Sequence, residues 1–142
     1  MVLDSSAALA ILQNEPEAST FALCIERAER VLISAVSVLE VGIVIEARRG
    51  ADGAGHLDAL LREGLIEVAA FDADQSALAR QAFRRYGKGR HPAALNFGDC
   101  AAYALAKISG EPLLYKGDDF TLTDLSPADP AMKGRPQGPE KG

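Results

Sequence analysis

Four carboxylates in this chain sit where an isolated acid is costly, at the end of an apolar segment or inside one. They are Asp4, Glu40, Asp99 and Asp118. Moving one ionised carboxylate into apolar surroundings costs several kcal/mol, or it raises the pKa until the group is neutral. A set of acids that shares a cation avoids this penalty. The sequence therefore predicts one shared site, with a hard divalent cation as its ligand.

The choice of metal follows from which other ligands the chain offers. It has two histidines and two cysteines, and Cys24 and Cys100 are far apart with no CxxC pair. A zinc site is therefore not expected, and both cysteines are predicted to be small buried thiols. A site made of carboxylates alone favours Mg²⁺ or Mn²⁺.

Three of the acids also have structural explanations. Asp4 follows a short apolar run and is a candidate helix N-cap. Glu40 completes an S-x-x-E pattern that begins at Ser37, so it fits a capping box. Asp99 opens an apolar helix, where the helix dipole favours an acid. These roles do not exclude metal binding, because each puts the acid at an end of an element.

The fourth acid belongs to an adjacent pair, Asp118 and Asp119, that follows an apolar run. We expect Asp118 to complete the site and Asp119 to anchor the loop. Ser6 is a candidate hydrogen-bond donor behind the site, although a plain helix-capping role explains it equally well.

Strands and helices are predicted to alternate along the chain. The expected strands are 2–3, 31–33, 66–71 and 113–115, with a weak fifth at 123–125. The expected helices are 7–12, 17–30, 53–64, 74–86 and 99–109. A further helix is expected to start within 34–37, to run to 49 and to be ended by Gly50. Asp74 is the expected cap of helix 74–86. The helix that carries Glu40 is apolar on nearly every face and is predicted to be buried. Such alternation predicts an α/β fold in which ligands bind at the carboxyl ends of parallel strands.

Length and composition indicate one globular domain over residues 1–126. Residues 127–142 hold four prolines and three glycines with no apolar periodicity, and we predict that they are disordered. The net charge of -5 argues against a nonspecific nucleic-acid coat protein. With no signal peptide and no membrane-length apolar run, a cytoplasmic location is expected.

Four stretches of the chain resemble the PIN domain, and in particular the toxin half of bacterial VapBC toxin–antitoxin pairs. They are VLDSSA at 2–7, SAVSVLEV at 34–41, LNFGDCAAYALA at 95–106 and LLYKGDDF at 113–120. Each is weak alone, but their order along the chain is specific. Many relatives place the last acid one residue earlier, where this chain has Gly117.

The resemblance implies a three-layer fold with a five-stranded parallel sheet flanked by helices and the acids at one edge. It implies a Mg²⁺- or Mn²⁺-dependent endoribonuclease, a homodimer, and a cognate VapB-like antitoxin that blocks the site. For such an enzyme we expect Asp4, Glu40, Asp99 and Asp118 to be the catalytic and metal-binding residues. A basic stretch could hold the RNA backbone by charge, or could be a solvated helix face and loop; its residues are Arg84, Arg85, Lys88 and Arg90.

Two other functions remain open from the residues. A Mg²⁺-dependent phosphotransfer or phosphatase domain would use Asp4 as nucleophile with a lysine nearby, for which Lys116 is the candidate, but it leaves Glu40 without a role. A non-catalytic PIN-like binding module is the other alternative, which the intact set of acids makes less attractive.

Overall fold

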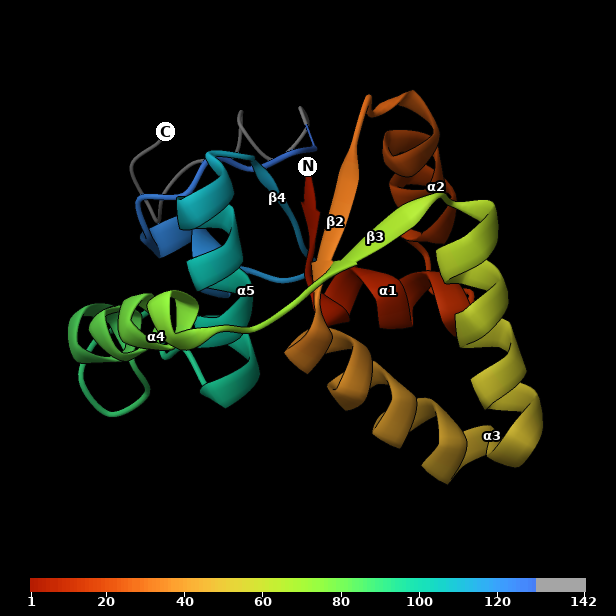
Figure 1. Ribbon diagram of the computed structural model, residues 1–142, viewed down its shortest axis with the longest axis horizontal. Helices are drawn as coiled ribbons and strands as arrows, with labels where there is room; N and C mark the ends of the chain where they lie inside the picture. The colour runs from red at the N-terminus through yellow and green to blue at the C-terminus, as the bar shows by residue number, and fades with distance from the viewer. Residues whose placement is uncertain (130–142) are drawn as a thin grey trace.

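A parallel sheet forms the centre of the molecule (Figure 1). The computed structural model describes residues 1–129. The sheet has the order β3-β2-β1-β4, with β1 at Val2–Leu3, β2 at Val31–Ser34, β3 at Ile66–Ala69 and β4 at Leu113–Leu114. The helices are α1 at Ser5–Leu12, α2 at Ala18–Arg27, α3 at Ala35–Glu63, α4 at Ala73–Tyr86 and α5 at Phe97–Ser109. The predicted α/β class and the parallel sheet are confirmed.

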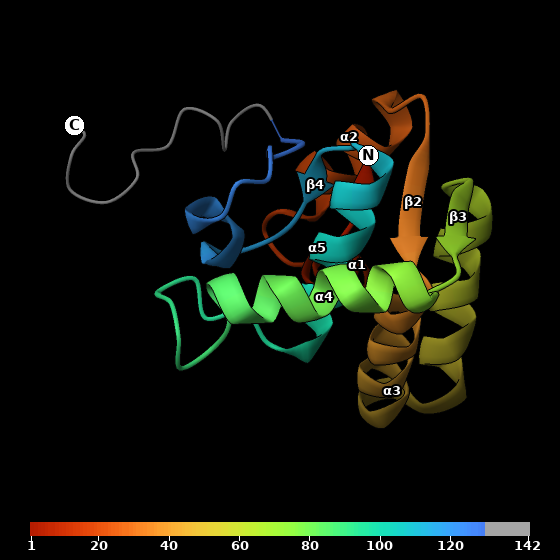
Figure 2. The same cartoon turned by 60° about the vertical axis from the view of Figure 1, so that its left-hand side comes forward.

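Helices cover both faces of the sheet and make the predicted three layers. In Figure 1, α4 and α5 lie on one side, and α1, α2 and α3 lie on the other. Figure 2 shows α4 lying across α5. Because side chains alternate along a strand, Val2 enters the core under α4 and α5, whereas Leu3 enters the core under α1, α2 and α3. A strand buried on both faces needs an unbroken apolar run, and β1 has one.

The predicted fifth strand is wrong for the part of the chain that the structure describes, where the sheet has four strands. The chain after β4 forms a 3₁₀-helix, Asp119–Leu122, and then meets β4 at a single bridge between Leu113 and Pro127. Pro127 has no N–H, so pairing stops at the bonds that Leu113 makes with its neighbours Ser126 and Ala128. Of the predicted tail, residues 130–142 lie outside the described residues.

The helix boundaries differ from the prediction in two informative places. Asp72, not Asp74, caps α4, because its side chain accepts a hydrogen bond from the Gln75 amide at 2.9 Å. The backbone leaves the helical region at Gly50, as predicted, with φ of 62°. The chain then resumes a helix directly, so the two expected helices form one kinked α3.

The prediction that the helix carrying Glu40 is buried is also wrong. Leu39 and Ile43 on α3 are 64% and 61% exposed. One face of α3 packs on the sheet through Val41 and Ile45, and the apolar side chains on the other face have no partner element among residues 1–129. No helix within those residues is long and apolar enough to cross a membrane.

Candidate active site

Asp4 lies at the carboxyl end of β1 and is also the N-cap of α1. One carboxylate oxygen, Oδ2, accepts hydrogen bonds from the Ser6 amide at 3.0 Å and the Ser6 hydroxyl at 2.6 Å. The other oxygen, Oδ1, is buried and accepts no hydrogen bond from residues 1–129. A side chain that is 1% exposed rarely leaves a polar atom unsatisfied. Asp4 therefore caps the helix with one oxygen, as considered for it, and its other oxygen stays without a donor among residues 1–129.

The electrostatics of Asp4 link it to two of the other acids. Its pKa is raised to about 7, mainly by burial and also by the charges of Asp99 and Glu40, while the hydrogen bonds from Ser6 oppose the rise. Three of the four predicted acids thus lie close enough to interact, although they come from β1, α3 and α5. The structure brings together residues that are up to 95 positions apart in the sequence.

Glu40 does not form the capping box considered for it. Ser34, not Ser37, is the N-cap of α3, and its hydroxyl accepts a hydrogen bond from the Val36 amide at 3.2 Å. Glu40 consequently lies one turn further into the helix than the pattern predicts. Its Oε1 is buried with no hydrogen-bond partner among the described residues. The carboxylate lies against Gly98, where a methyl group would come within 2.9 Å of Cδ of Glu40.

Asp99 lies in the first turn of α5 and forms a capping box with Asn96. The Asp99 amide donates to Oδ1 of Asn96 at 2.9 Å, and Oδ2 of Asp99 accepts from the Asn96 amide at 3.0 Å. Burial raises the pKa of Asp99 to about 6, with contributions from Asp119 and Glu40. Asn96 had no predicted role. Its N-x-x-D spacing is the signal that finds it, because a helix cap often takes this form.

Of the two acids after β4, Asp119 is the one whose charge acts on another predicted site acid, because it contributes to the raised pKa of Asp99. Asp118 begins the 3₁₀-helix, and its carbonyl accepts hydrogen bonds from the amide and hydroxyl of Thr121. Both side chains are exposed. Gly117 just before the pair has a φ of 93°, a backbone conformation that favours glycine.

The acids fit a hard cation by donor type and by their unsatisfied oxygens. Asp4 and Glu40 each present a buried carboxylate oxygen without a hydrogen-bond donor, and burial holds both Asp4 and Asp99 toward their neutral forms. Within residues 1–129, no three Asp, Glu, His or Cys side chains are already drawn together tightly enough to enclose an ion. Mg²⁺ needs no such cluster, because it usually takes only one or two protein carboxylates and keeps several waters.

The basic stretch lies at the end of α4 and in the loop after it, with Arg84, Arg85, Lys88 and Arg90 all exposed. Two of these residues have partners in the chain. Arg85 pairs with Asp124 at 3.6 Å, and Arg90 lies over the ring of Phe83. Of the two cysteines, Cys100 is buried and Cys24 is partly exposed, and both are free thiols.

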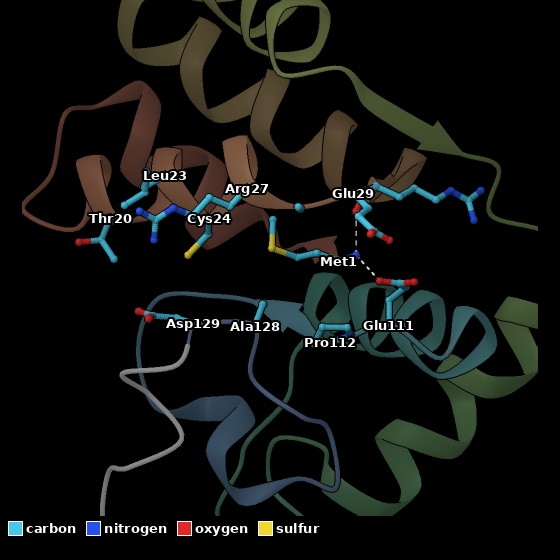
Figure 3. Close-up of a pocket in the computed structure, with 12 residues that line it drawn as sticks. Met1, Thr20, Leu23, Cys24, Arg27, Glu29, Glu111, Pro112, Ala128 and Asp129 are labelled. Carbon is cyan, nitrogen blue, oxygen red and sulfur yellow. Dashed lines mark hydrogen bonds and ion pairs between the residues drawn. The ribbon is translucent and has the colours of Figure 1, made fainter.

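A cavity of about 610 Å³ lies at the opposite edge of the sheet, where the strands begin (Figure 3). There the amino group of Met1 donates to the carbonyl of Arg30 and pairs with Glu111. These interactions fix the start of β1 next to β2 and β4. The acids occupy the other edge, which is the edge where ligands of parallel sheets bind.

Known proteins match nearly the whole chain. The family model of the PIN domain matches residues 1–125. Ribonuclease VapC30 of Mycobacterium tuberculosis is 50% identical over 126 residues, which cover 89% of this chain and 96% of the relative. Ribonuclease VapC of Mycolicibacterium smegmatis is also 50% identical, over 89% of this chain and 98% of its own length.

Solved structures agree on the fold. The toxin VapC20 of Mycobacterium tuberculosis, described as cleaving the sarcin-ricin loop, superposes with a TM-score of 0.72 at 18% identity and covers 87% of this chain and 95% of its own. VapBC2 from Rickettsia felis, solved with a DNA fragment from its promoter, superposes with a TM-score of 0.68 at 14% identity. The match covers 89% of this chain and 94% of the other. By sequence and by fold, the chain belongs to the PIN-domain family and, within it, to the VapC ribonucleases.

Proposed function

We propose that this chain is a Mg²⁺- or Mn²⁺-dependent endoribonuclease that acts as the toxin of a toxin–antitoxin pair. Family membership supports the ribonuclease activity and the toxin role. The metal dependence rests on one observation above all. Asp4 and Glu40 each have a buried carboxylate oxygen without a donor among residues 1–129, and the charges of Glu40 and Asp99 both act on Asp4. Such a group of acids is costly without a cation.

Each acid has a part in the proposed site. Asp4 and Asp99 would bind the ion directly, because each has one oxygen fixed by a neighbouring donor and therefore a defined orientation. Glu40 would bind directly or through water and orient the attacking water. Asp119 would complete the site next to Asp99. When bound, the cation lowers the pKa of a coordinated water and neutralises charge on the phosphate.

Three partners belong to the proposal. The RNA backbone would lie along the exposed basic residues at the end of α4, which supply positive charge that the acidic edge lacks. A VapB-like antitoxin would cover the site, as the membership of the chain among VapC proteins suggests. A homodimer would bury apolar side chains that α3 and the start of α5 expose, of which Phe97 is 83% exposed.

The phosphotransfer alternative loses support from the position of its proposed lysine. The ammonium group of Lys116 lies 2.5 Å from Oε1 of Glu15 and 3.5 Å from Oε1 of Glu17, and so is engaged away from Asp4. Glu40 has no role in that chemistry. A non-catalytic module would not need buried unsatisfied carboxylates at one edge of the sheet.

Replacing single acids tests the proposal. Asp4→Asn and Asp99→Asn should each abolish cleavage of RNA in Mg²⁺ or Mn²⁺ while the circular dichroism spectrum stays unchanged. Asp58→Asn, an exposed acid on α3, is the matched control and should cleave at the wild-type rate. Full cleavage by either site variant, or by wild type in excess EDTA, would overturn the proposed metal-dependent site.

A further inference from the structure

Lys116 connects the loop that carries the fourth acid to the site. This loop, residues 116–119, leads from β4 to the first residue of the 3₁₀-helix, and all four of its residues are exposed. Buried aromatic side chains hold its two ends, Tyr115 before it and Phe120 after it. Between these anchors the chain turns through Gly117, which has no side chain to contact other residues. Lys116 makes hydrogen bonds and ion pairs from this loop to other elements of the fold.

Lys116 contacts other elements in two ways, through a hydrogen bond of its main-chain amide and through ion pairs of its ammonium group. Its main-chain amide donates to the Ser6 hydroxyl at 2.9 Å, and that hydroxyl donates to Oδ2 of Asp4 at 2.6 Å. A continuous chain of hydrogen bonds thus runs from the acidic loop to the most buried acid of the site. Because the Ser6 hydroxyl accepts from the loop and donates to Asp4, the position of the loop affects the orientation of the Asp4 carboxylate.

The second interaction is made by the ammonium group of Lys116. It pairs with Glu15 at 2.5 Å and with Glu17 at 3.5 Å, both in the connection between α1 and α2. Hydrogen bonding to Glu15 and the nearby charges of the two glutamates raise the pKa of Lys116, so the group is cationic at neutral pH. The loop is therefore joined to the connection between α1 and α2 as well as to Ser6.

We propose that Lys116 is a positioning residue that sets the distance between the acidic loop and Asp99 through its ion pair with Glu15 and Glu17. The inference rests on the proposed metal site and deepens it. Exposed ion pairs add little to the free energy of unfolding, so this one is poorly suited to stabilising the fold. It is well suited to restricting a short loop whose acid must meet a cation, because metal affinity depends on ligand geometry at the scale of tenths of an ångström.

The test compares variants that break the pair from either side. Lys116→Met removes the charge, the double variant Glu15→Gln/Glu17→Gln removes its partners, and Lys116→Arg keeps the tie. The readouts are the Mn²⁺ affinity in the absence of RNA, measured by electron paramagnetic resonance, and the Mg²⁺ concentration that gives half-maximal cleavage. Arg30→Met is the control, because it breaks another exposed pair, Arg30–Glu67 at 3.2 Å, with the same change in charge.

We expect both pair-breaking variants to weaken Mn²⁺ binding and to raise the required Mg²⁺ by about tenfold. The Tm should stay within about 3 °C of wild type, and Lys116→Arg and Arg30→Met should bind metal as wild type does. If Lys116 instead bound the RNA, Lys116→Met would raise the KM for RNA and the glutamate variant would not. That result would overturn the proposal, as would unchanged metal affinity in both variants.

The outcome separates this inference from the function on which it rests. If wild type binds no Mn²⁺ and cleaves without divalent cations, the metal-dependent function itself is wrong. If wild type needs the metal and the variants need no more of it than wild type, only the role of Lys116 is wrong.

Discussion

The carboxylate of Glu40 occupies the space beside the Cα of Gly98 that a side chain would otherwise fill. A Cβ at that position would lie within 2.9 Å of Cδ and Oε2 of Glu40 and closer still to Oε1. The glycine is therefore required by an acid of the site itself, which lets α3 and α5 approach closely enough for Glu40 to interact with Asp99.

Gly98→Ala should displace Glu40 and reduce cleavage. The atoms that the new Cβ would meet are the far end of the flexible Glu40 side chain, which can turn away. The Tm should therefore stay the same or rise, since alanine favours a helix over glycine by about 1 kcal/mol, while cleavage falls because Glu40 has moved. Gly55→Ala on α3, where nothing lies within 4 Å of a new Cβ, is the matched control and should be neutral or stabilising. Thermal unfolding measures both. A higher Tm for Gly98→Ala with full activity would contradict the contact.

The two acids after β4 should differ in their effect on Asp99. Asp119→Asn removes a charge that raises the pKa of Asp99, so this pKa should fall, and metal-dependent cleavage should fall with it. Asp118→Asn should leave the pKa of Asp99 where it is and should reduce cleavage less. Carboxyl ¹³C NMR titration of the metal-free protein checks the pKa values. Equal pKa changes in the two variants would remove the reason for preferring Asp119.

The stability of the metal-free protein should fall as the pH rises. The pKa values of Asp4 and Asp99 are raised from 3.8 to about 7 and about 6. The folded chain therefore keeps protons that the unfolded chain has already released, and this contribution to stability is complete below about pH 4 and lost as the pH passes through 6 and 7.

Mg²⁺ should reverse this loss, because in the proposed site it would bind the ionised carboxylates. The increase in Tm on adding Mg²⁺ should be larger at about pH 8 than at about pH 5. Differential scanning calorimetry at both pH values gives the comparison. An equal increase at the two values would show that Asp4 and Asp99 are not the groups that the ion binds.

Asp4→Asn should stabilise the metal-free protein at about pH 8 while abolishing activity, since it removes a buried charge and keeps the size of the side chain. The Ser6 amide can still donate to the new side-chain oxygen, so the cap of α1 survives. Thermal unfolding in EDTA measures the effect. A lower Tm than wild type would mean that the ionised carboxylate stabilises the fold without any cation.

The exposed apolar face of α3 gives a test of the proposed homodimer. Ile43→Lys should produce a folded monomer. The side chain is already 61% exposed within one chain, so the charge should not disturb the core. Leu65→Lys, which changes a residue that is 83% exposed in another part of the fold, should not change the assembly. Analytical ultracentrifugation distinguishes the species, and a monomeric wild type would contradict the proposal.

Much of this protein follows from local patterns in the sequence. Alternating apolar runs and helix signals determine the α/β class, because buried parallel strands need unbroken apolar residues. The positions of Asp4 and Asp99 at the ends of elements also follow from the sequence, since capping depends on residues within one turn. The Asn96–Asp99 box could have been found in the same way, and the Ser37–Glu40 pattern shows that such a signal can also mislead, because the helix begins earlier, at Ala35.

Other features depend on contacts between distant segments. The fit of Glu40 against Gly98, the preference for Asp119 over Asp118 and the ties made by Lys116 all join residues from different elements. The exposed face of α3 also depends on tertiary contacts, because the sequence of the helix alone does not show which of its apolar side chains pack on the sheet. The sequence determined which acids stand at the ends of elements, and the tertiary structure decided which of their oxygens are buried together, because burial depends on how the elements pack.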